Sequence, residues 1–287
     1  MKVAVVGVGR WGENHVRVLS KLGWLYGVYD TNRERALDIS KKYGTFAYQS
    51  LDDLSSSSLD AAVVATPAST HFSLGMQLVE KGINLLLEKP PTLKLKEALK
   101  IKEVSNLKGV KVGVGYIERF NPAFKQLESC LKRSDQAYFF RLSKGSNVKD
   151  VGVIYDLMIH DINLSNHLFG NPKVVYKKRK VGDGLDVRAE AVIEYKTATS
   201  HLTASWTSPV KFRKIFAHSD QLFAEADLAA KTGFCEDGGQ KILVEEKDVD
   251  LLEAEHIGFK KFIEEGSEFP NIEESLKDLE VIELLMG

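Results

Sequence analysis

The sequence is poor in cysteine, with only Cys130 and Cys235 among its 287 residues. Two cysteines this far apart are too few for a zinc cluster or for the disulfide framework of a small secreted domain. They favour buried free thiols in a reducing compartment. The seven histidines also show no close spacing of the kind that metal ligands have, so no metal site is expected.

The sequence also lacks an excess of charge and a long hydrophobic run. Its 39 basic and 40 acidic side chains leave a formal net charge of -1 and are spread along the chain. This balance argues against a surface for nucleic acid or for a membrane, and favours a small-molecule partner. No run approaches the roughly 18 apolar residues of a membrane span, and the apolar start is too short for an export signal. We therefore expect a cytoplasmic protein.

Short hydrophobic runs alternate with helical patterns over residues 1–119. This rhythm predicts a nucleotide-binding α/β domain with a wound parallel sheet. Four glycines, at positions 23, 44, 82 and 109, stand where C-caps belong. The predicted strands cover residues 3–6, 25–29, 61–65, 84–87 and 110–114, and the predicted helices cover residues 14–22, 33–43, 69–81 and 94–107.

Residues 120–287 have a different pattern, in which short strands dominate between helices. We predict an α+β domain with a mostly antiparallel sheet. Its predicted strands cover residues 137–143, 174–181, 188–195, 200–207, 213–218, 221–228 and 241–244. Its predicted helices cover residues 122–131, 154–168, 251–265 and 272–286.

A glycine-rich loop, Gly7-Val8-Gly9-Arg10-Trp11-Gly12, follows the first strand and opens a helix. In this context the glycines permit a tight turn, close approach to a pyrophosphate and close helix–strand packing. Free N–H groups at the helix start can bind the anion. The loop therefore predicts dinucleotide binding by Gly7, Gly9 and Gly12, with Arg10 and Trp11 beside them. Trp11 could either line the cofactor's edge or pack under its adenine side.

The second strand ends at Asp30, about 20 residues beyond the loop. A carboxylate here can accept hydrogen bonds from the ribose hydroxyls of NAD, and it should repel the 2′-phosphate of NADP. Asn32 and Arg33 follow directly and belong to the predicted cofactor site. Because Arg33 could bind a 2′-phosphate, or simply be solvated, NAD is expected and NADP is not excluded.

Lys89 stands at the end of the fourth strand, in Glu88-Lys89-Pro90-Pro91. Open α/β sheets bind ligands at this edge, and the following proline restricts the backbone of Lys89. A lysine there can donate to a substrate hydroxyl and stabilise developing alkoxide charge. The alternative is a surface lysine before a turn.

Asp156 and His160 are four residues apart and would share one face of a helix. Histidine is suited to take a hydroxyl proton near neutral pH, and a carboxylate can orient the imidazole and stabilise the imidazolium. An exposed helix pair or a satisfied core histidine is the alternative.

In combination, these motifs resemble the glucose-fructose oxidoreductase, inositol dehydrogenase and rhizopine-catabolism (Gfo/Idh/MocA) family over nearly the whole chain. The resemblance implies a Rossmann domain and a second α+β domain whose large open sheet often makes the oligomer interface, so a homodimer or homotetramer is expected. It also implies that Lys89, Asp156 and His160 are catalytic. Further matching features are His15, Ala65-Thr66-Pro67 with His71, Glu88, and Leu168-Phe169-Gly170; of these, Thr66, Pro67, His71 and Glu88 are expected to border the cofactor.

Residues 115–122 and 153–161 look like the branch of this family that oxidises nucleotide sugars. Tyr116, Arg119 and Asn121 are therefore candidate contacts for a sugar or its phosphates, although Arg119 and Asn121 could instead anchor the crossover between domains. Asn163 departs from the family, which commonly has aspartate at this position, and the chain is short for the family.

The resulting hypothesis is hydride transfer between the cofactor and a secondary alcohol of a sugar-like substrate. His160 would remove the alcohol proton, Lys89 would share the oxygen's charge and Asp156 would orient the base. One alternative is an inositol or free-sugar dehydrogenase. Another is a non-catalytic protein that senses NAD.

Overall fold

The structure, a computed structural model, describes residues 1–146, 148–245 and 248–287 and divides into two compact units. The first unit joins residues 1–115 to residues 252–276. The second joins residues 116–251 to residues 277–287. The chain thus leaves the first unit, builds the second, returns to the first over residues 252–276 and ends in the second.

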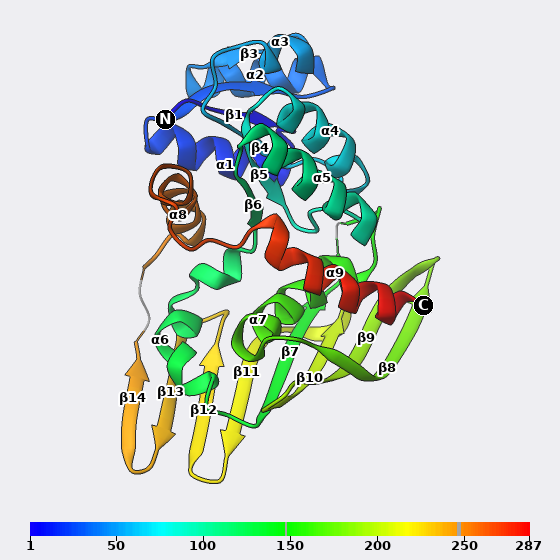
Figure 1. Cartoon of the computed structure of the whole chain (residues 1–287), viewed down its shortest axis with the longest axis vertical. Coiled ribbons are helices and arrows are strands. Elements are labelled where there is room, and N and C mark those ends of the chain that lie inside the picture. The colour runs from blue at the N-terminus through cyan, green and yellow to red at the C-terminus, as the bar shows by residue number, and fades with distance from the viewer. Residues whose placement is uncertain (147, 246–247) are drawn as a thin grey trace. The chain divides into compact units, whose positions relative to one another are not determined.

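The first unit is a parallel six-stranded sheet in the order β3-β2-β1-β4-β5-β6, flanked by helices (Figure 1). This confirms the predicted wound α/β domain. The order changes direction between β1 and β4, where open α/β sheets bind ligands beyond the carboxyl ends of the strands. The strands are β1 Val3–Val6, β2 Leu25–Tyr29, β3 Phe46–Ala47, β4 Ala61–Val64, β5 Asn84–Glu88 and β6 Val112–Gly115. The helices are α1 Arg10–Lys21, α2 Arg33–Tyr43, α3 Leu51–Ser55, α4 Ala68–Glu80, α5 Leu95–Lys108 and α8 Leu251–Glu265.

The central strands of this sheet are hydrophobic at every position because helices cover both faces. Strands β1 and β4 are buried throughout. Helices α2 and α5 end at Gly44 and Gly109, which adopt left-handed backbone conformations with φ of 64° and 66°. Glycine reaches this conformation without steric cost, so these residues end the helices as the sequence predicts.

The second unit is built on an eight-stranded sheet in the order β14-β13-β12-β11-β7-β10-β9-β8 (Figure 1). Neighbouring strands are antiparallel except β10 and β7, which confirms the predicted mostly antiparallel sheet. The strands are β7 Gln136–Lys144, β8 Lys173–Gly182, β9 Leu185–Glu194, β10 Thr199–Ser205, β11 Thr207–Ser219, β12 Leu222–Asp227, β13 Thr232–Asp237 and β14 Gln240–Val244. The helical elements are η1 Ile117–Phe120, α6 Pro122–Leu131, η2 Ile154–Met158 and α7 Ile159–Phe169, with α9 Ile272–Met286 shared between the units.

One face of this sheet is buried and the other is half-exposed. Along β7, the buried side chains of Ala137, Phe139 and Arg141 alternate with the half-exposed side chains of Tyr138 and Phe140. Successive side chains of a strand point to opposite faces, so this alternation marks the two faces of the sheet. Helices α6 and α7 pack against the strands.

The return of the chain distinguishes the observed units from the sequence-based division into residues 1–119 and 120–287. The loop after α8 is tied to β6, because the Val114 N–H donates to the Pro270 carbonyl at 2.8 Å and Gly113 forms an antiparallel bridge with Asn271. A Cβ at Gly113 would lie 2.6 Å from the ring of Phe269, so glycine makes this close packing possible. Residues 252–276 therefore belong to the compact unit of the N-terminal sheet.

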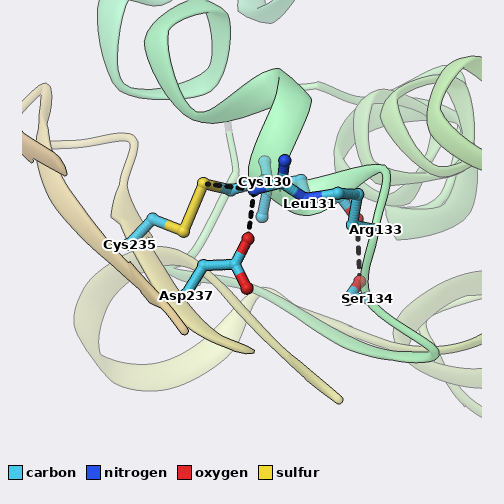
Figure 2. Close-up of a disulfide and its surroundings, with 6 residues drawn as sticks. All are labelled: Cys130, Leu131, Arg133, Ser134, Cys235 and Asp237. Atoms are coloured by element: carbon cyan, nitrogen blue, oxygen red, sulfur yellow. Dashed lines mark hydrogen bonds and ion pairs between the residues drawn. A yellow bond between two sulfur atoms is a disulfide. The ribbon is translucent and has the colours of Figure 1, made fainter. Parts of the chain in front are cut away.

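The prediction of two free thiols is wrong, because Cys130 and Cys235 form a disulfide in the second unit (Figure 2). Helix α6 packs on β13 and brings their Cα atoms to 6.5 Å although 105 residues separate them in sequence. Arg133, in the turn after α6, and Asp237 of β13 form an ion pair beside the disulfide (Figure 2). The large separation of the two cysteines in sequence therefore did not show that they lie close together in the fold.

Several elements differ from the sequence prediction. Strand β13 was not predicted, because its sequence, Thr-Gly-Phe-Cys-Glu-Asp, lacks a regular alternation of apolar and polar residues. The expected helix over residues 154–168 begins with a π-helical turn, η2, and becomes α-helical at Ile159. Among the described helices, none is both long and apolar enough to cross a membrane.

Candidate functional site

The glycine loop occupies the turn between β1 and α1, and two of its glycines are required by its geometry. Gly7 has a φ of 85°, and a Cβ there would lie 2.8 Å from the carbonyl oxygen of Ala65. A Cβ at Gly12 would overlap the carbonyl oxygen of Gly7. These contacts let helix α1 start directly against the end of the central strand.

Gly9 is different, because its Cβ position is open. The nearest neighbouring atom is Nη1 of Arg35, at 4.0 Å. Gly9 is also the N-cap of α1, and no side chain caps that helix start. Uncapped N–H groups with open space before them fit a pyrophosphate, as dinucleotide binding requires. Arg10 and Trp11, the first residues of α1, are exposed beside this space.

Asp30 follows β2 and braces the loop. Its Oδ2 accepts a hydrogen bond from the Val8 N–H at 2.9 Å, and its Oδ1 accepts one from the Asn32 N–H at 2.8 Å. The Asn32 side chain in turn caps helix α2 by accepting from the Arg35 N–H at 3.0 Å. The carboxylate is therefore held beside the glycine loop, where it can still accept hydrogen bonds from a ribose.

The two arginines after Asp30 have different surroundings. Arg33 donates through Nη1 to the carbonyl oxygen of Tyr48 at 2.7 Å and to that of Ala47 at 3.2 Å. Arg35 Nη1 lies 3.9 Å from Asp30 Oδ2, and the side chain is about half exposed. Arg35, which sequence reasoning did not select, is thus the arginine next to both Asp30 and Gly9.

Thr66, Pro67 and His71 lie where β4 ends and α4 begins. His71 is buried, with Nδ1 2.7 Å from the Pro90 carbonyl oxygen and Nε2 2.9 Å from the Thr66 carbonyl oxygen. The ring thereby bridges the ends of β4 and β5. The Thr66 hydroxyl lies 2.7 Å from the Thr70 hydroxyl, at the same edge of the sheet.

Glu88 ends β5 and is almost completely buried. Its Oε1 lies 2.9 Å from Nε2 of His15, and its Oε2 accepts from the Lys89 N–H at 3.2 Å. Burial tends to raise the pKa of Glu88, but the hydrogen bond from His15, with help from Trp11 and Lys89, lowers it overall. Glu88 is therefore an ionised group that anchors the backbone of Lys89, whose side chain is half-buried.

Asp156 and His160 occupy the second unit, on either side of the change from π- to α-helix. Asp156 is half-buried in η2 and its Oδ2 accepts from the Trp206 indole N–H at 3.0 Å and from the Ser146 hydroxyl at 3.3 Å. His160 lies in the first turn of α7 and is 8% exposed. π-Helical turns are rare and often occur at functional sites.

A buried ion cluster holds the residue next to His160. Arg141 of β7 donates to both oxygens of Asp161, with Nη2 2.8 Å from Oδ1, and its Nη1 donates to Glu118 Oε1 at 2.7 Å. Burial tends to raise the pKa of Glu118, but Arg141 and Arg213 together lower it. For Asp161, burial outweighs Arg141 and raises the pKa. The hydrogen bonds between Arg141 and Asp161 nevertheless tie α7 to β7.

Tyr116, Arg119 and Asn121 lie around η1, at the start of the second unit, and all are buried. Asn121 caps α6 by accepting from the Ala123 N–H, and its amide donates to Glu118 Oε2 at 3.0 Å and to the Leu228 carbonyl at 2.9 Å. These three bonds hold the turn between η1 and α6 in place within the second unit.

Within the first unit, the structure brings the glycine loop, Asp30, Thr66 and Lys89 to the carboxyl edge of one sheet. Within the second, Asp156 and His160 lie on consecutive helical turns. Sequence reasoning missed Arg141 and Trp206, which hold these turns. A charged residue at an inward position of a strand was the available signal for Arg141, since buried arginine is rare unless paired.

Two family models match the chain. The model described as "Oxidoreductase family, NAD-binding Rossmann fold" matches residues 1–116. The model described as "GFO/IDH/MocA C-terminal domain" matches residues 134–221. Both belong to the family that the motifs resemble.

Curated relatives and solved structures agree with these matches. UDP-N-acetylglucosamine 3-dehydrogenase from Acidithiobacillus ferrooxidans is 31% identical over 72% of this chain and 62% of the relative. scyllo-Inositol 2-dehydrogenase (NAD(+)) from Bacillus subtilis is 29% identical over 59% of this chain and 54% of the relative. The alignments thus span less than two thirds of either relative. A solved structure of the Acidithiobacillus ferrooxidans enzyme superposes with a TM-score of 0.92 at 25% identity, covering 99% of this chain and 96% of that one.

Proposed function

The chain belongs to the Gfo/Idh/MocA oxidoreductase family, and from this premise we propose that it is an NAD-dependent dehydrogenase acting on a secondary alcohol of a nucleotide sugar. The observation that carries the proposal is the similarity to UDP-N-acetylglucosamine 3-dehydrogenase, which extends in fold over 99% of the chain. The dinucleotide loop and the sheet edge described above support the cofactor part of it.

The residues proposed to hold NAD are those at the carboxyl edge of the first sheet. Gly7, Gly9 and Gly12 would admit the pyrophosphate, and Asp30 would accept from the adenosine ribose. The carboxylate favours NAD over NADP, because its charge repels a 2′-phosphate. Arg35 is the nearest side chain that could reverse this preference.

In the proposed oxidation of the alcohol, three side chains have separate roles. Bound NAD supplies the hydride acceptor, and the alcohol becomes a carbonyl with release of one proton. His160 takes the hydroxyl proton, Lys89 stabilises negative charge on that oxygen, and Asp156 stabilises the imidazolium. The anchoring of the Lys89 backbone by Glu88 and the hold of Trp206 on Asp156 support these roles, since catalytic groups need fixed positions.

The experiment that tests the proposal is an assay of NADH absorbance with the purified chain across UDP-N-acetylglucosamine, UDP-glucose, myo-inositol and free sugars. We expect turnover with UDP-N-acetylglucosamine. We expect His160→Ala to lose at least about 100-fold in turnover, a general-base contribution, while still binding NAD. Turnover of inositol or free sugars alone would move the chain to the polyol-oxidising members of the family. Tight NAD binding without turnover of any substrate would favour a sensor.

We propose further that the protein forms a homodimer or homotetramer through the half-exposed face of the second sheet. Tyr138, Phe140 and Phe216 lie on that face, and Tyr138 stacks on His201 with ring centroids 4.6 Å apart. Such an aromatic surface is typical of interfaces. Light scattering after size exclusion tests this, because Phe216→Glu should yield monomers.

We also propose a cytoplasmic location, where NAD and nucleotide sugars are available. The Cys130–Cys235 disulfide removes the free-thiol argument for it, since disulfides are rare in that compartment. Thiol alkylation of the protein in intact cells, followed by mass spectrometry and cell fractionation, tests both the location and the state of the pair.

A further inference from the structure

Four titratable side chains form a buried cluster in the first unit, and one of them, Glu88, accepts from the Lys89 N–H. His15 of α1 lies between Glu88 of β5 and His256 of α8, with its Nδ1 3.0 Å from His256 Nε2 and its Nε2 2.9 Å from Glu88 Oε1. Glu255 precedes His256 on the same helix, and both are completely buried. The return of the chain to the first unit thus brings Glu255 and His256 into the interior of that unit. His256 meets His15 there although 241 residues separate them in sequence.

The proton positions in this chain of hydrogen bonds follow from the charges. Glu88 is ionised and only accepts, so Nε2 of His15 carries the proton that it receives. Burial lowers the pKa of His256 well below its usual value, so His256 is a neutral ring with one N–H. His256 Nδ1 has no partner among the described residues. An unpaired acceptor is less costly than an unpaired N–H, so the proton of His256 lies on Nε2 and is donated to His15 Nδ1.

Glu255 is the second carboxyl group of the cluster, and it differs from Glu88. Neither of its oxygens has a partner among the described residues. Burial, and then the charge of Glu88, raise its pKa well above the usual value and so favour its neutral form. The titratable groups that act on this cluster are His15 from α1, Glu88 and Lys89 from the end of β5, and its own two members on α8.

We propose that His256 and Glu255 are positioning residues for the dehydrogenase chemistry: His256 fixes the tautomer of His15, which holds the Glu88 carboxylate and through it the backbone of Lys89. Glu255, being neutral, keeps a second negative charge away from Glu88. This inference rests on the proposed role of Lys89. Room for the carboxylate is provided by Gly115 of β6, where a Cβ would lie 2.9 Å from Glu88 Oε1.

The test compares variants of the full chain. His256→Leu removes the donor, and His256→Gln replaces it with an amide N–H. Glu255→Gln removes the buried carboxyl group, and Glu253→Gln is its control. Glu253 lies on the same helix but forms a surface ion pair with Lys21. For each variant, the pH profiles of kcat and KM are measured, and ¹⁵N chemical shifts of the histidine rings report the tautomer of His15 without substrate or cofactor.

We expect His256→Leu to lower kcat by about 10- to 100-fold, as small misplacements of catalytic groups do, with little change in the KM for NAD. His256→Gln should recover most of this loss. Glu255→Gln should move the alkaline fall of kcat to higher pH, because glutamine cannot ionise beside Glu88, and Glu253→Gln should leave the profile unchanged. The His15 ring should be protonated at Nε2 in the wild type and lose this preference in His256→Leu.

An unchanged kcat profile in His256→Leu, or an unchanged His15 tautomer, would overturn the inference. A wild-type chain that turns over no substrate would instead refute the proposed function. In that case the nitrogen shifts still decide whether His256 controls His15, so the two failures are distinguishable.

Discussion

Replacement of Asp278 by asparagine should flatten the dependence of stability on pH. Asp278 lies on the part of α9 that belongs to the second unit and is completely buried. It accepts hydrogen bonds from the amides of Asn163 at 2.9 Å and Asn166 at 2.8 Å, and so ties α9 to α7. Burial raises its pKa from 3.8 to about 6, because hydrogen bonds from these amides and from Tyr116 offset only part of the desolvation.

The sign and size of the effect follow from this shift. A carboxyl group whose pKa is raised on folding contributes stability below its unfolded pKa and loses it as the pH rises through the folded value. The stability that Asp278 contributes is therefore lost as the pH rises from near 4 to near 6. A shift of about two pKa units corresponds to roughly 3 kcal/mol, of which about 2 kcal/mol is lost between pH 4.5 and pH 7.

Urea unfolding of the wild type and of Asp278→Asn at pH 4.5 and pH 7 measures this loss. The other titrating groups are common to both proteins and cancel in the difference, whatever the asparagine costs in absolute stability. Glu280→Gln, an exposed position on the same helix, serves as the control and should keep the wild-type pH dependence. The reasoning is refuted if wild type and Asp278→Asn change by the same free energy between the two pH values.

Three further predictions concern the loop, the ion cluster and the disulfide. Gly12→Ala should abolish NAD binding in calorimetry, because its Cβ would overlap a loop carbonyl oxygen; binding at wild-type affinity would contradict the loop geometry. Arg141→Met should lower the free energy of unfolding by about 3–5 kcal/mol, since it removes the arginine that donates to Asp161 and leaves Glu118 with Arg213 alone. A much smaller loss in urea titration would contradict this role of Arg141. Cys130→Ala should cost about 2–4 kcal/mol in non-reducing urea titrations, and a wild type that binds two equivalents of thiol reagent would show that the pair is reduced.

The alternating strands and helices of residues 1–115 could be predicted from the sequence because their signals are local. Strand and helix alternate within a few tens of residues, and the glycine loop and the end of the second strand carry the ligand-binding pattern in one short stretch. The helix over residues 33–43 was predicted to the residue, since Asn32 caps its start and Gly44 its end. The position of Lys89 directly after a strand could be predicted for the same reason, because strand ends are visible in sequence.

Only the tertiary structure revealed the contacts between distant residues. The Cys130–Cys235 disulfide, the pairing of Arg141 with Asp161, and the approach of His256 to His15 join residues that no periodicity relates. Each depends on how helices pack on a sheet, and the return of α8 to the first unit depends on hydrogen bonds to β6. The sequence by itself determined most of the elements and the glycine-loop motif, because backbone propensity, capping and hydrophobic periodicity act over a few residues. The folded chain decided which charges meet, because burial and pairing are properties of three-dimensional packing.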